Sequence, residues 1–197
     1  MAERVGVFPG TFNPLTVAHL AIATAARQQR RLARVVLAVS VSPIGKEHVD
    51  RPRFADRLAV LHEEATASGG WLDVIVTDHR LLVDIAAGFD VLIMGADKWA
   101  QVNDPAYYGG SPGARDAAIA ALPELAIAAR PPTAVPPEHA LDVDVEHAPV
   151  SSSAVRAGRH DWMSPAAAAF DARTSAWTDP ARYDAWLRAN RQEKDER

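Results

Sequence analysis

The 197-residue chain contains no cysteine and only three methionines. The absence of cysteine excludes disulfide bonds and thiolate metal ligands, and with them disulfide-stapled folds and cysteine-based zinc sites. Six of the seven histidines show no metal-ligand spacing: His48, His62, His79, His139, His147 and His160. We therefore expect no structural zinc site and no metal held by protein side chains alone.

The chain also lacks a long hydrophobic run and an excess of positive charge. No stretch is long and apolar enough to cross a bilayer, and the N-terminal MAERVGVF has neither the basic start nor the long apolar stretch of a signal peptide. Acidic residues outnumber lysine plus arginine by 25 to 21, which argues against nonspecific binding to nucleic acid. We therefore expect a cytoplasmic protein with neither a membrane nor a nucleic acid as its partner.

The chain does contain alternating apolar runs and amphipathic stretches. They predict strands at 5–8, 35–41, 71–76, 90–94, 124–129 and 141–145, and helices at 53–67, 81–87, 114–122 and 180–190, with a turn-rich loop at 101–113. This alternation predicts an α/β fold with a doubly wound parallel sheet, which binds ligands beyond the carboxyl ends of its strands. Residues 1–197 are expected to form one domain, with 173–197 as a C-terminal helical extension and charged tail.

The first apolar run leads into the segment Pro9–His19, which reads PGTFNPLTVAH. A helix is expected to begin near Thr16 or Val17, after the Pro-Gly turn, which places His19 in its first turn. Helix N-termini present unpaired N–H groups and partial positive charge, so they attract phosphate, and a histidine adds a donor. The alternative is an ordinary strand-to-helix turn, with Asn13 and Thr16 as caps and His19 merely solvated.

A second segment, residues 150–156, reads VSSSAVR and follows the strand expected at 141–145. Capping of the helix that follows explains one of its serines. It does not explain three serines in a row followed by an arginine. Hydroxyls, free N–H groups and a guanidinium in one turn form an oxyanion cradle, so this segment predicts a second phosphate-binding group.

Together the two segments resemble the motifs of the nucleotidyltransferase superfamily of adenylyl- and cytidylyltransferases, which is similar in fold to class I aminoacyl-tRNA synthetases. The first motif, roughly G-x-F-x-P-x-[H/T]-x-G-H, matches residues 10–19, and the last, I-S-S-[ST]-x-[IV]-[RK], matches residues 150–156. One departure is Ala18, where the family usually has glycine and a methyl group narrows the approach to the helix backbone. The resemblance covers about residues 4 to 172. It implies a Rossmann-like nucleotidyltransferase (HIGH-superfamily) fold with C-terminal helices.

The resemblance also implies an enzyme that transfers a nucleoside monophosphate, in the first instance AMP from ATP, to a small phosphorylated acceptor and releases pyrophosphate. It implies Mg²⁺ as the cofactor that accompanies the triphosphate, and members of the family are often homo-oligomers. The implied catalytic residues are His19, Thr16, Lys46 and Arg156. The implied nucleotide-binding residues are Gly10, Thr11, Phe12, His19, Gly95, Asp97, Ser151, Ser152, Ser153 and Arg156. The implied acceptor-binding residues are Lys46 and Trp99.

Three of these residues have plainer alternatives. Lys46 lies in the loop SPIGK, where the family often has a phosphate-binding lysine, but a loop lysine can also be merely solvated. Asp97 could be the N-cap of the helix that holds Trp99, and Trp99 could be a packing residue.

The acceptor stays open between subfamilies. Gly95-Ala96-Asp97 looks like the G-x-D of nicotinate or nicotinamide mononucleotide adenylyltransferases, which favours such a mononucleotide as acceptor. The stretch 81–84 (LLVD) and Thr16 instead resemble phosphopantetheine adenylyltransferases, and a cytidylyltransferase is a further alternative. An alternative from another class is a non-catalytic nucleotide-binding regulator, supported by Ala18 and the mixture of motifs.

Overall fold

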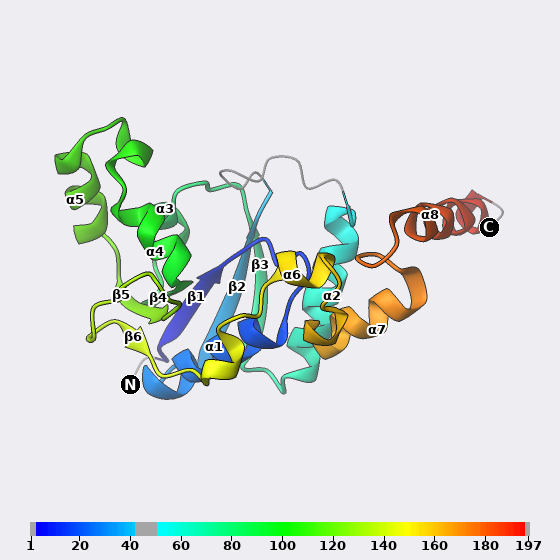
Figure 1. The fold of residues 1–197 in the computed structure, drawn as a ribbon, viewed down its shortest axis with the longest axis horizontal. Coiled ribbons are helices and arrows are strands. Elements are labelled where there is room, and N and C mark those ends of the chain that lie inside the picture. The colour runs from blue at the N-terminus through cyan, green and yellow to red at the C-terminus, as the bar shows by residue number, and fades with distance from the viewer. Residues whose placement is uncertain (1–2, 42–50, 196–197) are drawn as a thin grey trace.

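The computed structural model describes residues 3–41 and 51–195. Its centre is a six-stranded sheet in the order β3-β2-β1-β4-β5-β6, in which all neighbours pair in parallel (Figure 1). The strands are β1 (Val5–Pro9), β2 (Arg34–Ser40), β3 (Leu72–Thr77), β4 (Val91–Gly95), β5 (Glu124–Ala128) and β6 (Ala140–Leu141). The expected doubly wound parallel sheet is therefore confirmed. Its strand order reverses between β1 and β4, which is the position where such sheets bind ligands.

Helices cover both faces of the sheet (Figure 1). The α-helices are α1 (Val17–Gln29), α2 (Phe54–Ala67), α3 (Leu82–Ala86), α4 (Ala96–Asn103), α5 (Pro112–Ala120), α6 (Ser152–Arg156), α7 (Pro165–Thr174) and α8 (Pro180–Asp195). The described residues also form the short 3-10 helices η1 (Pro105–Tyr108), η2 (Val145–His147) and η3 (His160–Trp162). Among the helices of the described ranges, none combines the length and apolar character needed to cross a membrane.

Alternation along the strands separates two hydrophobic layers. In β4, Val91 and Ile93 pack in the layer that also holds apolar residues of α1 and α2. Their neighbours Leu92 and Met94 pack in the opposite layer with residues of α3, α4 and α5. A central strand buried on both faces reads as an unbroken apolar run, which is why the sequence predicts it well.

A third hydrophobic cluster joins α2 and α6 to the C-terminal helices. Its buried members include Val60 on α2, Val155 on α6, Phe170 on α7, and Trp177 and Tyr183 further along the chain. The two C-terminal helices lie on the side of the sheet where α2 lies, as the orange and red ribbons of Figure 1 show. The helix expected at 180–190 is therefore present as α8, which continues to Asp195 rather than ending at Asn190.

Two local expectations are wrong. The segment 101–113 is not a long loop, because α4 continues to Asn103 and η1 and α5 follow it, with side chains of Asp104 and Ser111 capping these two helices. The last strand is not 141–145, because β6 contains only two residues and Asp144 caps the 3-10 helix η2. In both places a short polar side chain bonds to nearby backbone N–H groups and ends one element or begins another.

Candidate active site

The β1–α1 loop (residues 10–16) begins at the carboxyl end of β1, beside the strand reversal. Gly10 donates its N–H to the carbonyl of Ala38 at 3.0 Å. A Cβ on Gly10 would lie 2.6 Å from the ring of Phe12, so glycine is required here by its own neighbour. The Phe12 side chain is only 2% exposed and packs edge-on against Phe8 at 5.7 Å between ring centroids. Of the expected nucleotide-binding residues, Phe12 can therefore offer a ligand only its backbone.

Thr16 and His19 form a reciprocal cap at the start of α1. The Thr16 hydroxyl accepts from the backbone N–H of His19 at 3.4 Å, while Nδ1 of His19 accepts from the backbone N–H of Thr16 at 3.1 Å. The Thr16 hydroxyl also lies 2.7 Å from Nδ1. With Nδ1 as the acceptor of the backbone N–H, the proton of a neutral imidazole is on Nε2, from which it can be donated to an anion.

The rings of Phe8 and Phe12 fix the imidazole from the side. Their centroids lie 6.0 and 5.2 Å from that of His19, and the Phe12 ring meets it edge to face. Ala18, the departure from the family motif, is 5% exposed, so its methyl group is buried in the protein. A ligand can therefore reach little of this methyl group, so the methyl group should narrow the approach to the helix backbone less than the sequence suggests.

The serine segment meets this loop directly. The Ser152 hydroxyl donates to the carbonyl of Pro14 at 2.7 Å, and the Arg156 guanidinium donates to the carbonyl of Asn13 through Nη1. Through Nη2, Arg156 also donates to the Ser153 hydroxyl at 3.3 Å. The β1–α1 loop and the serine segment, about 140 residues apart in the chain, are therefore hydrogen-bonded to each other. The cation in these bonds is the Arg156 guanidinium.

The three serines do different things. Ser151 is the N-cap of α6, and its hydroxyl accepts from the N–H of Ala154 at 3.1 Å. Ser152 donates its hydroxyl hydrogen to the β1–α1 loop. Ser153 is exposed, and its hydroxyl accepts from the guanidinium of Arg156. Ser153 and Arg156 are therefore the members of this segment whose side chains face solvent.

A buried arginine that the sequence analysis missed supports the same loop. Arg57 on α2 is 6% exposed and donates through Nη1 to the carbonyl of Thr11 at 3.0 Å. Its buried Nε has no hydrogen-bond partner within the described part of the chain. Burial lowers the pKa of the Arg57 guanidinium below its usual value. A buried, incompletely paired guanidinium contributes positive potential to the loop.

At the end of β4, Gly95 and Asp97 occupy the opposite side of the strand reversal. Gly95 is the N-cap of α4, so the alternative that Asp97 is the cap is wrong. Apart from its chain neighbours, no atom of the described residues lies within 4 Å of a Cβ built on Gly95, so the space beside it is open. The Asp97 carboxylate is exposed and pairs with Nη1 of Arg130 at 3.1 Å.

Arg130 is a second residue that the sequence analysis missed. It follows β5 and donates through Nε to the carbonyl of Ala148 at 2.9 Å and through Nη2 to that of Val150 at 2.6 Å. It therefore connects Asp97 to the backbone that leads into the serine segment. A basic residue directly after a strand was the signal that could have found it, since that edge of the sheet binds the ligand.

Two expected residues remain, Trp99 and Lys46. The Trp99 ring packs with the hydrophobic layer under α3, α4 and α5 and meets His139 edge-on at 6.2 Å, which matches its packing alternative. Lys46 lies outside the described residues. The described residues hold no group of three His, Cys, Asp or Glu side chains that could bind a metal.

A cavity of about 180 Å³ adjoins the other side of the β1–α1 loop. Pro9, Gly10 and Thr11 form the wall it shares with that loop. The opposite walls come from α3 and the two residues before it, from α4 and η1, and from α5 and the segment after it: Arg80, Leu81, Leu82, Val83, Ile85, Lys98, Gln101, Val102, Tyr107, Tyr108, Ala118 and Leu122. Burial raises the pKa of Tyr108 further above neutral pH, where a tyrosine hydroxyl is already protonated and can donate a hydrogen bond. The cavity therefore offers apolar walls with a few polar groups, the usual form of a small-molecule site.

Comparison with known proteins gives one family and a consistent set of relatives. A family model described as cytidylyltransferase-like matches residues 7–158. A probable nicotinate-nucleotide adenylyltransferase of Syntrophotalea carbinolica is 39% identical over 75 residues, covering 38% of this chain and 33% of the relative. One of Gloeobacter violaceus with the same description is 33% identical over 80 residues, covering 41% of this chain and 39% of the relative. The matched part of the chain thus spans between a third and two fifths of the length of these relatives.

Among solved structures, this fold is similar to Plasmodium falciparum nicotinic acid mononucleotide adenylyltransferase complexed with NaAD. The TM-score is 0.58, and the match covers 89% of this chain and 98% of the other. At 9% sequence identity the likeness concerns the fold. It agrees with the Rossmann-like arrangement of the sheet and its helices.

Proposed function

Because this chain belongs to the cytidylyltransferase-like family, we propose that it transfers AMP from ATP to a phosphorylated acceptor, nicotinate mononucleotide in the first place, and releases pyrophosphate. The observation that carries the proposal is the junction of the two motifs, in which Arg156 and Ser152 bond to the carbonyls of Asn13 and Pro14 beside His19. The names of the curated relatives support the choice of acceptor.

In the proposed reaction an oxygen of the acceptor phosphate attacks the α-phosphorus of ATP in line. The new O–P bond forms as the bond from the α-phosphorus to the bridging oxygen breaks, and pyrophosphate leaves with that oxygen. The attacking group is already an oxyanion, so it needs no strong general base. Catalysis then consists of positioning the two substrates and stabilising the negative charge that spreads in the transition state.

The residues take complementary parts in this reaction. His19 would donate from Nε2 to a phosphate oxygen at the reacting centre, since its Nδ1 is occupied by the N–H of Thr16. Arg156 and Ser153 would bind the departing phosphates, and Lys46 would contact the α-phosphate or the acceptor phosphate. Gly95 and Asp97 would border the nucleotide from the end of β4.

A divalent cation would accompany the triphosphate. The described residues bring no set of three metal-binding side chains together, so phosphate oxygens and water would supply most of its ligands. Bound in this way, Mg²⁺ neutralises charge on the phosphates.

The cavity between the β1–α1 loop and α3, α4, η1 and α5 is the acceptor site in this proposal. It reaches Gly10 and Thr11, so an acceptor bound there would present its phosphate to the loop from the side opposite α6. The aliphatic wall at 81–83 also favours a second candidate, a phosphopantetheine-type acceptor with its long flexible arm.

Pyrophosphate release with ATP or CTP, measured against nicotinate mononucleotide, nicotinamide mononucleotide and phosphopantetheine, tests the proposal. We expect turnover with ATP and nicotinate mononucleotide. Turnover with phosphopantetheine alone would move the assignment to the second candidate. Binding of ATP without pyrophosphate release from any pair would contradict an enzymatic function and favour a nucleotide-binding regulator.

A further inference from the structure

We infer that the C-terminal segment (residues 163–177) positions the β1–α1 loop for phosphate binding, with Trp177 as the principal positioning residue. The indole Nε1–H of Trp177 donates to Oδ1 of Asn13 at 2.6 Å. Trp177 is 6% exposed and Asn13 is 8% exposed, so water does not compete for this bond. The bond joins residues 164 positions apart and reaches the middle of the first motif.

Asn13 transmits this contact to the phosphate-binding side chains. Its side-chain oxygen accepts from Trp177, while its backbone carbonyl accepts from the guanidinium of Arg156. Its side-chain amide donates to the carbonyl of Arg51 at 3.3 Å. A displacement of the Asn13 backbone would therefore move the carbonyl that accepts from Arg156. Trp177 acts on the site through Asn13 and does not itself touch the phosphates.

The next residues of the loop are held from the same direction. The backbone N–H of Ser164 donates to the carbonyl of Leu15 at 3.0 Å, and Met163 forms an antiparallel bridge with Thr16. With the bond of Ser152 to Pro14, every residue from 13 to 16 is paired with the chain after residue 150. A loop fixed at successive residues needs little reorganisation when it binds an anion.

Trp177 is itself firmly placed. Its backbone N–H donates to the buried carboxylate of Asp171 at 2.7 Å, and its ring packs against that of Phe170 at 5.9 Å. These contacts hold the indole of Trp177 in place, so its bond to Asn13 starts from a fixed position.

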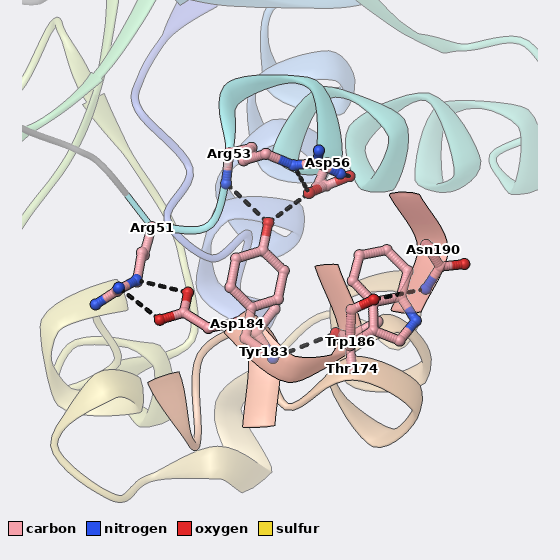
Figure 2. A network of polar contacts seen from close by, with 9 residues as sticks. Arg51, Arg53, Asp56, Thr174, Tyr183, Asp184, Trp186 and Asn190 are labelled. Carbon is pink, nitrogen blue, oxygen red and sulfur yellow. Dashed lines mark hydrogen bonds and ion pairs between the residues drawn. The ribbon is translucent and has the colours of Figure 1, made fainter. Parts of the chain in front are cut away.

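Helix α8 ties the C-terminal segment to the start of α2, as Figure 2 shows. The buried Tyr183 hydroxyl donates to the Asp56 carboxylate and accepts from the N–H of Arg53 at 3.0 Å. Asp184 binds the Arg51 guanidinium through two hydrogen bonds of 2.6 and 3.1 Å. The same Arg51 supplies the carbonyl that accepts from the Asn13 amide. Helix α8 therefore also contacts the residue that binds Asn13 from the other side.

The segment lies outside the region that matches the family model, which ends at residue 158. Its role therefore cannot be read from that match and has to come from its contacts. The inference rests on the proposed function for its catalytic consequence, but the contact of Trp177 with the loop can be tested without turnover.

The test compares Trp177→Phe with Trp186→Phe. Both changes replace indole by phenyl in the same hydrophobic cluster, but the Trp186 ring stacks on Tyr183 at 5.9 Å on α8. Amide hydrogen exchange of residues 10–19 and calorimetric titration with Mg-ATP are measured on the full chain. We expect Trp177→Phe to speed exchange in this peptide and to weaken ATP binding about tenfold, and Trp186→Phe to do neither.

Equal exchange of residues 10–19 in the two variants would overturn the inference. If the wild type binds no ATP, the proposed function fails, and the exchange comparison still decides whether Trp177 holds the loop. Should Trp177→Phe not fold, Asn13→Asp and Asn13→Val replace it. Aspartate keeps an oxygen acceptor for the indole N–H but loses the donor to Arg51, whereas valine loses both. We therefore expect faster exchange with valine than with aspartate, and equal exchange in both would overturn the inference.

Discussion

The two sides of the β1–α1 loop are built from different interactions. On the side of α6 and α7, guanidinium, hydroxyl, indole and backbone N–H groups hold residues 13–16. On the side of α3, α4 and α5, a cavity with leucine, valine and tyrosine walls meets Gly10 and Thr11. Phosphate recognition requires donors fixed before binding, whereas apolar walls select by shape. In the proposed reaction, the affinity for the nucleotide should therefore be sensitive to single polar substitutions, while the preference for the acceptor should vary with the residues that line the cavity.

The largest effect on the polar side is expected from His19→Ala. Loss of the Nε2 donor at the reacting centre should lower kcat about 100- to 1,000-fold, the cost of removing one transition-state donor. Pyrophosphate release measures the loss, and thermal unfolding checks that the fold survives. The exposed His62 on α2 gives the matched control, and His62→Ala should keep wild-type activity. Near-normal turnover by His19→Ala would refute the role of His19.

Arg156→Ala should have the next effect. Removing a charge-assisted donor should reduce kcat/KM for ATP about 10- to 100-fold. Arg159→Ala is the matched control, because Arg159 lies three residues away, pairs with Asp161 at 3.2 Å and covers the Trp162 ring at 3.7 Å. Equal losses in the two variants would show that general positive charge, and not the junction of the motifs, supports nucleotide binding.

Filling the cavity should sharpen the contrast between the two sides. Val83→Phe adds a ring to the cavity wall and should raise the KM for the acceptor about fivefold, as expected for a modest change in an apolar pocket. The KM for ATP should stay unchanged, because the residues proposed to bind its phosphates lie across the loop. Steady-state kinetics with each substrate varied in turn measure both constants. A parallel rise in the KM for ATP would contradict the separation of the two sites.

The smallest expected effect is on stability at high pH and concerns Tyr183, which ties α8 to the start of α2. Burial and the hydrogen bond to Asp56 raise the pKa of Tyr183, so the folded state holds this proton more tightly than the unfolded state. The corresponding stabilisation is complete below the unfolded pKa of about 10 and is lost as the pH rises through the folded pKa. Between neutral pH and a pH of about 11, the Tm of thermal unfolding should therefore fall more steeply for the wild type than for Tyr183→Phe. Parallel curves for the two proteins would contradict this.

Local sequence was enough to predict the sheet and the proximity of Thr16 and His19 in the candidate site. Runs such as VVLAV and VLIM are buried on both faces, so they read as strands without knowledge of their neighbours. Thr16 and His19 interact within one helical turn, so the motif itself implied their proximity. The segment 101–113 was mispredicted because the caps at Asp104 and Ser111 use the same residue types as turns.

The supports of the site could not be predicted in this way. Arg57 reaches Thr11 across 46 residues, and Trp177 reaches Asn13 across 164. In sequence an arginine on an amphipathic helix reads as a solvated residue, and a tryptophan near a closing helix reads as core. Their contacts with the loop arise only when α2 and the segment after α7 pack against it, which is a tertiary property.

The central claim is that one triphosphate binds between the β1–α1 loop and α6. A crystal structure of the full chain with a non-hydrolysable ATP analogue and Mg²⁺ tests it most directly. The account predicts phosphate oxygens within hydrogen-bond distance of both Nε2 of His19 and the Arg156 guanidinium. A triphosphate that contacts only one of these groups, or lies elsewhere on the molecule, would contradict it.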